Sequence, residues 1–256
     1  MGDRKDLHAA PGKQNKDAHS GTSDPPAFFR SRRSRDHTTE ILCTLVKALN
    51  SHATSHQPPL VNLIGIELLN EPDPPSDFNL QGWYTSTIKA LRKIDSNIPL
   101  YLGECWRTEQ YADFVQTKAS SLLVLDHHLY RCFTTSDNST PVHEHIWALS
   151  DSSAPTPQMF ARVIEKLGRA GGGLVVGEWS GGLNSGSLTG KHGEQGEYVR
   201  AQLGLYERYC AGWFFWTYKK QWTGDTGWSL RDSVGSGVFP DRVGLYRKRE
   251  ITIDEE

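Results

Sequence analysis

Short apolar runs alternate with longer amphipathic segments along this chain. Apolar runs of strand length occupy residues 61–68, 100–103, 122–126, 173–177 and 212–216. Between them, apolar residues recur with helical spacing over residues 38–49, 83–94, 109–118, 156–169 and 194–210. Strands that alternate with helices are typical of βα units around a parallel sheet. The pattern therefore predicts an α/β fold with five strands.

The first 37 residues do not share this pattern. They are polar and rich in turn-forming residues, and Met1 to Lys5 is too polar to predict a strand. The arginine-rich stretch from Arg30 to Arg35 has no aromatic residue within it that could stack on bases, so we expect a solvated surface there. We therefore divide the chain into an irregular N-terminal segment, residues 1–37, and a β/α domain, residues 38–256.

Composition and charge exclude several classes of protein. The 256 residues carry 28 Lys and Arg against 30 Asp and Glu, a net charge of −2, which argues against a protein that binds nucleic acid or a membrane surface. No apolar run approaches the roughly 20 residues of a membrane span, and the start lacks the apolar core of a signal peptide. The four cysteines, Cys43, Cys105, Cys132 and Cys210, form no C-x-x-C pair, so we expect mostly buried free thiols.

Polar or aromatic residues follow every predicted strand. The clusters are Asn70-Glu71-Pro72, Glu104-Cys105-Trp106, His127-His128-Leu129-Tyr130, Glu178-Trp179 and Trp216-Thr217-Tyr218. Chemistry at the carboxyl ends of successive parallel strands is typical of a TIM barrel, whereas a doubly wound sheet gathers its ligand groups at one switch point. The chain has no G-x-G-x-x-G and no Walker loop, which argues against a nucleotide cofactor.

Two strand-end carboxylates, Glu71 and Glu178, are the candidates for catalysis. Carboxyl groups on either side of a glycosidic bond can serve as acid and nucleophile, and a barrel would bring these strand ends together. The alternative for either residue is a structural role, as a helix cap or as the partner of an arginine. Glu67 and Glu104 compete for the same roles. Glu67 lies inside its strand and is expected to pair within the barrel, and Glu104 is expected to support the site from behind.

A metal site is not expected. His143-Glu144-His145 has a spacing that suits two ligands, but the sequence offers no third ligand nearby. We therefore interpret this segment as a surface loop, and we expect neither a metal ion nor another cofactor.

These residues together resemble glycoside hydrolase family 5, most of all its fungal exo-β-1,3-glucanase branch. Residues 65–72 are similar to the acid/base strand of that family, and residues 177–179 to its seventh strand, which bears the nucleophile. Residues 6–15, 126–130 and 212–216 resemble, in the right order, the end of its third strand, its sixth strand and its eighth strand. The resemblance covers nearly the whole chain and implies an incomplete (β/α)8 TIM barrel with about strands 4–8 present.

The resemblance implies a role for each strand-end residue. Glu71 would be the acid/base and Glu178 the nucleophile. Asn70 would hydrogen-bond the sugar 2-hydroxyl, an interaction that strengthens in the transition state. Tyr130 would hold the nucleophile through its phenol hydroxyl.

Further residues would line the sugar subsites. His8 and His128 would surround the terminal glucose, and because side chains alternate along a strand, only one of His127 and His128 can point inward. Aromatic faces for the sugar would come from Trp216, and more weakly from Trp106 and Trp222. Trp213 is expected in the core.

The chain departs from the family at its start. The first two βα units and most of the third strand have no counterpart, and no residue matches the arginine that the second strand places beside the nucleophile. Without that positive neighbour, ionised Glu178 would be less favoured. Missing neighbours would also expose strand edges and apolar faces, at about 25 cal/mol per Å² of apolar area. We therefore expect marginal stability, and no activity of this chain alone unless a partner or another packing closes the gap.

The expected function is retaining hydrolysis of β-glucosidic bonds, most of all exo-acting on β-1,3-glucan. The expected partner is accordingly a β-glucan or β-glucoside. One alternative is a family 5 β-glucosidase or β-1,4-glucanase of other specificity, and another is an inactive barrel fragment that binds glucan through aromatic side chains. Relatives in the family include secreted and cell-wall-associated enzymes, and the sequence does not indicate an oligomeric state.

Overall fold

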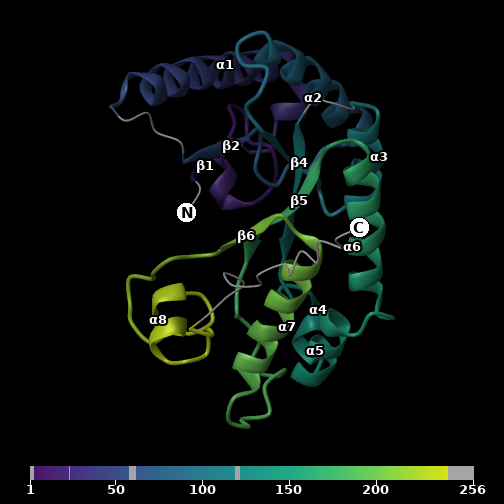
Figure 1. Ribbon diagram of the computed structural model, residues 1–256, viewed down its shortest axis with the longest axis vertical. Coiled ribbons are helices and arrows are strands. Elements are labelled where there is room, and N and C mark those ends of the chain that lie inside the picture. Colours follow the sequence, from purple (N-terminus) through teal and green to yellow (C-terminus); the bar gives the residue numbers. More distant parts are fainter. Residues whose placement is uncertain (1–2, 23, 58–61, 119–121, 242–256) are drawn as a thin grey trace, which may run out of the picture. The chain divides into compact units, whose positions relative to one another are not determined.

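A computed structural model describes residues 3–22, 24–57, 62–118 and 122–241 (Figure 1). These residues form two compact units. The first comprises the described residues of Met1–His128 together with Ala161–Val175, and the second comprises Leu129–Phe160 with the described residues of Val176–Glu256. None of the helices in the described parts of the chain combines enough length with enough apolar character to cross a bilayer.

The first unit is built on parallel strands in chain order. Its strands are β1 (Asp3–Asp6), β2 (Leu63–Glu67), β3 (Leu100–Gly103), most of β4 (Leu123–Leu129) and the start of β5 (Gly173–Trp179). β1 pairs with β2, β2 with β3 and β3 with β4, each in parallel. The predicted parallel β/α arrangement is therefore confirmed, although Val61, which began one predicted strand, lies outside the described residues.

The strand β1 was not predicted, because its sequence is polar. Its residues nevertheless pair with β2, with Arg4 opposite Gly65 and Asp6 opposite Glu67. The side chain of Arg4 is almost fully buried and forms ion pairs with Glu67 and Asp126. A charged side chain can be buried in a strand when its charge is compensated there. The described residues thus contain six strands, one more than predicted.

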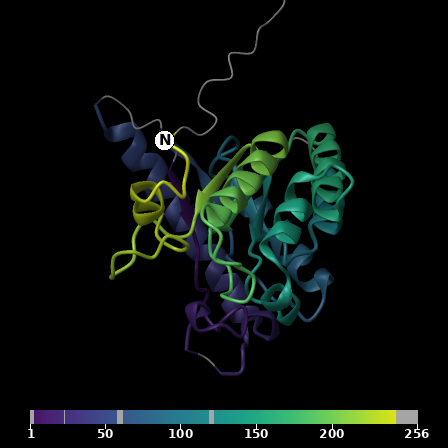
Figure 2. The same ribbon diagram turned by 90° about the horizontal axis from the view of Figure 1, so that it is seen from below.

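Helices of the first unit cover its strands. They are α1 (Arg32–Ser55), α2 (Asp77–Arg92), α3 (Thr108–Gln116) and the later part of α6 (Pro155–Arg169), with short 3-10 turns η1 (Ala18–Ser20) and η2 (Phe28–Arg30). The long helix α1, blue in Figure 2, contacts α2. It begins at Arg32, earlier than predicted, because Ser31 caps it by accepting a hydrogen bond from the Ser34 N–H.

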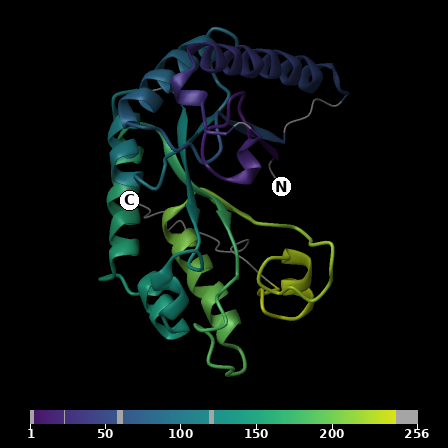
Figure 3. The ribbon, with the colours of Figure 1, turned by 180° about the vertical axis from the view of Figure 1, so that it is seen from behind.

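The second unit contains the remaining elements. They are α4 (Thr135–Ser139), α5 (Val142–Ser150), the start of α6, the end of β5, α7 (Glu194–Tyr209), β6 (Gly212–Phe215) and α8 (Leu230–Gly235). Helices α5 and α7 pack side by side (Figure 3). The Trp216 N–H, just after β6, donates to the Trp179 carbonyl at 2.8 Å. Trp179 is fully buried and its ring lies 5.4 Å from that of Trp213, which packs against it but is half-buried rather than in the core as expected.

Two smaller expectations were wrong. The segment His143-Glu144-His145 lies in helix α5 rather than in a surface loop, and His145 is fully buried. Its ring nitrogen Nδ1 accepts a hydrogen bond from the Arg131 Nε–H at 3.0 Å, and burial together with the Arg131 charge lowers the pKa of His145. The four cysteines are free thiols, but each is partly exposed rather than buried.

Gly103, the last residue of β3, allows this strand to approach the chain that follows β2. A Cβ atom at this position would lie 2.7 Å from the Leu69 carbonyl oxygen and 2.9 Å from Cδ of Pro72. One atom belongs to the backbone and the other to a proline ring, so neither can move away without a shift of the backbone. The carbonyl of Gly103 also accepts a hydrogen bond from the buried Tyr84 hydroxyl at 2.8 Å.

We expect Gly103→Ala to lower the free energy of unfolding by about 1–3 kcal/mol, because the methyl group forces a backbone shift. Gly82→Ala is the matched control, since Gly82 lies within α2 and a Cβ atom there meets nothing within 4 Å. The control is expected to gain about 0.5–1 kcal/mol from the higher helix propensity of alanine. Urea denaturation followed by circular dichroism measures both changes, and equal midpoints for the two variants would contradict this account.

Candidate active site

Glu71 follows β2 in an unusual backbone conformation that the neighbouring loop supports. Its φ of 40° lies in the left-handed region, which costs a non-glycine residue on the order of 1–3 kcal/mol. Gln14 donates from Nε2 to the Asn70 carbonyl at 3.0 Å, and Asn15 donates from Nδ2 to the Glu71 carbonyl at 2.8 Å. Both amide side chains are buried. The loop after β1 therefore fixes the backbone that carries this carboxylate.

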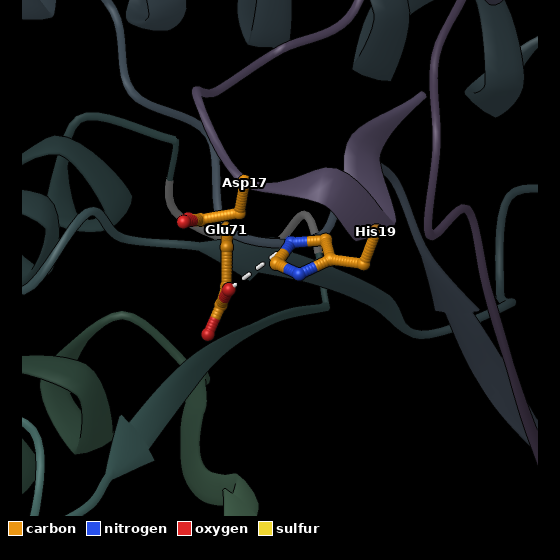
Figure 4. A group of neighbouring side chains, drawn as sticks. All are labelled: Asp17, His19 and Glu71. Carbon is orange, nitrogen blue, oxygen red and sulfur yellow. Dashed lines mark ion pairs between the residues drawn. The ribbon is translucent and has the colours of Figure 1, made fainter. Parts of the chain in front are cut away.

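Two histidines contact the Glu71 carboxylate on its two oxygens. His128 Nδ1 lies 2.8 Å from Oε1, and because an ionised carboxylate only accepts hydrogen bonds, this nitrogen is the donor. His19 Nε2 lies 3.3 Å from Oε2 (Figure 4). Burial raises the pKa of Glu71, but the His128 hydrogen bond and the charges of His128, His19 and His8 outweigh it. The pKa of Glu71 is therefore lowered.

A buried charge network lies behind His128. The Arg4 guanidinium pairs with Asp126 and, at 3.1 Å, with Glu67, and Asp126 Oδ2 lies 3.6 Å from His128 Nε2. Burial and the charge of Asp126 raise the pKa of Glu67. Burial also opposes ionisation of Asp126, but the hydrogen bond with His128 and the charge of Arg4 prevail and lower its pKa. Asp126 is thus the ionised partner that orients His128, and Glu67 pairs inside the sheet as expected.

The adjacent residues His127 and His128 contact different glutamates. While His128 contacts Glu71, His127 Nδ1 lies 2.5 Å from Glu104 Oε1 and 3.3 Å from the Thr108 hydroxyl. Both rings are buried. Alternation along β4 therefore directs only His128 toward the Glu71 carboxylate, and Glu104 contacts the other histidine rather than Glu71.

Glu178 is held in the second unit at the carboxyl end of β5. Its Oε2 accepts a hydrogen bond from the Tyr130 hydroxyl at 2.9 Å, and Glu178 is buried. The Tyr130 ring stacks on Trp228 at 5.5 Å between ring centroids. Gly182 leaves room for this tryptophan, because a Cβ atom there would lie 2.6 Å from its Nε1. The Tyr130 hydroxyl is therefore positioned by aromatic packing.

The remaining candidates differ in exposure. Trp216, Trp106 and Trp222 are 43%, 57% and 68% exposed as whole residues, and Trp106 Nε1 donates to the His128 carbonyl at 3.1 Å. His8 Nδ1 lies 2.8 Å from Asp6 Oδ2, and its ring lies 5.0 Å from the His19 ring. Asn70 is buried, and its Nδ2 has no hydrogen-bond partner among the described residues.

A small pocket opens beside the Glu71 carboxylate within the first unit. Its lining residues are Glu71, Gly103, Glu104, Cys105, Trp106, Asp126 and His128. Carboxylate, imidazole and indole groups therefore surround one small hollow beside Glu71.

Three residues of the site escaped the sequence-based prediction. Asp126 precedes His128 by two residues on β4, so strand alternation could have placed it on the same face. His19 belongs to a polar segment with no periodicity, and no pattern singled it out. Trp228 lies in an irregular region after β6, and only the folded structure shows that it stacks on Tyr130.

Comparison with known families and proteins gives consistent matches. The family model for cellulase (glycosyl hydrolase family 5) matches residues 32–221. Glucan 1,3-beta-glucosidase 3 of Schizosaccharomyces pombe is 32% identical over 243 residues, which cover 91% of this chain and 47% of that protein. Probable glucan 1,3-beta-glucosidase A of Aspergillus fumigatus is 28% identical over 277 residues, covering 92% of this chain and 60% of that protein. The chain thus spans about half the length of the curated relatives it matches.

Solved structures share the backbone arrangement. Rutinosidase from Aspergillus niger superposes with a TM-score of 0.70 at 17% identity, covering 93% of this chain and 67% of that chain. XacCel5A, solved in complex with cellopentaose, has a TM-score of 0.56 at 14% identity, covering 89% of this chain and 66% of that chain. These likenesses concern the fold, and they confirm the predicted incomplete (β/α)8 barrel. Because the family model covers well over half of its residues, the chain belongs to glycosyl hydrolase family 5.

Proposed function

We propose that this family 5 chain is a retaining glycoside hydrolase that cleaves β-glucosidic bonds, with β-1,3-glucan attacked from a chain end as its substrate. Glu71 protonates the leaving oxygen while Glu178 attacks the anomeric carbon. Glu71 then acts as base on the water that releases the sugar from Glu178. Such a mechanism needs one carboxyl group that exchanges a proton and one that stays ionised.

One observation carries the proposal: two strand-end glutamates are each held by a hydrogen bond from the carboxyl end of β4. His128 is the last but one residue of β4 and bonds Glu71, while Tyr130, which directly follows β4, bonds Glu178. A neutral phenol donor stabilises an ionised nucleophile without adding positive charge. The His128 hydrogen bond fixes where the Glu71 carboxylate lies, although it favours the ionised form, so protonation of Glu71 must accompany binding of the substrate.

Asn70 supports recognition of the sugar. Its buried Nδ2 group has no hydrogen-bond partner among the described residues, and an unsatisfied buried donor costs about 1–3 kcal/mol. The sugar 2-hydroxyl would satisfy this donor, which gives a reason for its orientation. The exposed face of Trp216 would support the apolar side of the sugar.

The specificity for β-1,3 linkages rests on the relatives. Those named above are glucan 1,3-beta-glucosidases by name, at 28–32% identity, and they are longer than this chain. A hydrolysis panel of laminarin, cellulose and glycosylceramide tests the specificity. Release of glucose from laminarin in preference to the other two is the expected result, and preference for cellulose or glycosylceramide would replace the β-1,3 assignment by another family 5 specificity.

The purified 256-residue chain also tests whether it is active alone. The expectation from the sequence, inactivity without a partner, stays a prediction. Laminarin hydrolysis that disappears in Glu178→Gln would support the proposed function and contradict that prediction. Laminarin binding without hydrolysis would favour the alternative of a glucan-binding fragment.

Covalent labelling identifies the nucleophile. A 2-deoxy-2-fluoro-β-glucosyl fluoride forms a long-lived glycosyl–enzyme ester, so we expect mass spectrometry to find the label on the peptide that contains Glu178. Glu178→Gln should remain unlabelled. Glu197→Gln, which changes an exposed glutamate on α7, should be labelled like the wild type. A label on another residue would contradict the assigned role.

Glu71 is expected to titrate differently without His19. His19 is one of the groups that lower the pKa of Glu71, so His19→Gln should raise this pKa. Carbon-13 NMR titration of the glutamate carboxyl groups measures the shift. His37→Gln is the control, because His37 lies 3.5 Å from Glu40 on the surface of α1 and is not among the groups that shift Glu71.

The lowered pKa of Glu71 also makes the free energy of unfolding depend on pH. A lowered pKa in the folded state stabilises the protein at pH above the ordinary glutamate value, and this stability is lost as the pH falls through the folded value. His19→Gln should therefore show a smaller loss of stability on acidification between those two values. An unchanged titration of Glu71 in this variant would show that His19 does not act on it.

A further inference from the structure

In the first unit, Asp17, His19 and Glu71 lie close together, with His19 facing the Glu71 carboxylate (Figure 4). One ligand atom from each residue lies within 4.8 Å of the other two, and His19 Nε2 is already 3.3 Å from Glu71 Oε2. In a tetrahedral zinc site with bonds of about 2.0–2.2 Å, neighbouring ligand atoms are about 3.4 Å apart. To reach this separation, the exposed Asp17 side chain would move closer and His19 Nε2 would give up its contact with Asn15 Nδ2.

The segment that carries the first two ligands is firmly held. The Asn15 side chain accepts from the Asp17 N–H at 2.9 Å and donates to the Glu71 carbonyl at 2.8 Å. Ser20 is buried, and its hydroxyl donates to the carbonyls of Asn15 and Asp17 at 3.1 and 2.8 Å. The turn η1 is thereby tied to the backbone of the third ligand. These hydrogen bonds hold the segment, while Nε2 of His19 itself lies 3.3 Å from Asn15 Nδ2, a contact that a bound metal ion would replace.

The third ligand is oriented from its other side. Glu71 Oε1 receives the hydrogen bond from His128, which leaves Oε2 for His19. Hydrogen bonds to the outer atoms of metal ligands are a regular feature of metal sites, because they fix the ligand geometry. One imidazole with two carboxylates suits a divalent transition metal such as Zn²⁺, whereas Mg²⁺ and Ca²⁺ prefer oxygen ligands alone.

A second group with metal-ligating residues does not qualify. Glu67, Asp126 and His128 also place three ligand atoms close together. The guanidinium of Arg4 already occupies this group through its ion pairs with both carboxylates, and the group is fully buried. A cation there would meet a positive charge, while Asp17 and His19 are open to solvent.

We propose that Asp17, His19 and Glu71 form a binding site for a divalent transition-metal ion, with Zn²⁺ the best match, and that an ion in this site occupies the carboxylate of Glu71. Binding of the metal ion does not require that the chain hydrolyses a glycoside. Its consequence, inhibition of hydrolysis, rests on the function proposed above, because a metal-bound carboxylate can neither donate nor accept the proton of the reaction.

Isothermal titration with ZnCl₂ tests the site on the metal-stripped 256-residue chain. A His52→Gln/His56→Gln background removes another chelating pair, since these two rings lie 4.2 Å apart. Asp17→Asn and His19→Gln should each weaken zinc binding by at least about tenfold, because each removes a ligand. Asp36→Asn, an exposed aspartate on α1, is the matched control and should bind zinc like the background protein.

Equal zinc affinity in Asp17→Asn, His19→Gln and the control would overturn the site, and so would Mg²⁺ binding as tight as that of Zn²⁺. Measurements of hydrolysis distinguish a failure of the metal site from a failure of the proposed hydrolase function. Asp17→Asn should keep the metal-free activity and lose inhibition by zinc. A chain that shows the expected binding pattern but never hydrolyses a β-glucoside would keep its metal site, and only the proposed function would fail.

Discussion

The position of Glu71 depends on two amide side chains from a distant part of the sequence. The segment Asn70-Glu71 turns through a left-handed conformation that an isolated peptide would avoid. Gln14 and Asn15 hold both of its carbonyls, and Gln14 itself is fixed by the Ala10 N–H at 3.0 Å. Strain at a reactive residue persists only where the surroundings over-determine it. The loop after β1 therefore fixes both the geometry and the backbone energy of the site.

Ion pairs of Arg4 connect β1, the strand that precedes this loop, to two other strands of the sheet. Arg4 on β1 meets Glu67 on β2 and Asp126 on β4, so one buried cation holds two carboxylates from different strands. Breaking such a buried pair typically costs several kcal/mol, because the remaining charge has no partner. The same network orients His128 through Asp126. The stability of the sheet and the alignment of the Glu71 carboxylate thus have a common electrostatic origin.

Much of this arrangement was accessible from the sequence, and the reasons for the failures are physical. The apolar runs predicted five strands because continuous apolar sequence marks strands buried on both faces. β1 was missed because its sequence is polar and its Arg4 side chain is held by ion pairs rather than by apolar contacts, and the helical His143–His145 segment because it is too short and polar to show a period. Glu71, His128, Tyr130 and Glu178 follow from strand ends. His19 and Trp228 do not, since tertiary contacts between irregular segments leave no periodic signal.

The two carboxylates differ in the partners that the fold gives them, and this difference bears on their roles. Glu71 has imidazoles on both oxygens, and together with the charge of His8 they lower the pKa of its carboxyl. Glu178 accepts from a phenol whose ring is fixed by stacking on Trp228 and which adds no positive charge. Two carboxyl groups in such different surroundings can separate into one that exchanges protons and one that remains an anion. That asymmetry follows in part from the residue types at positions 128 and 130, because one short segment of chain brings an imidazole to Glu71 and a phenol to Glu178.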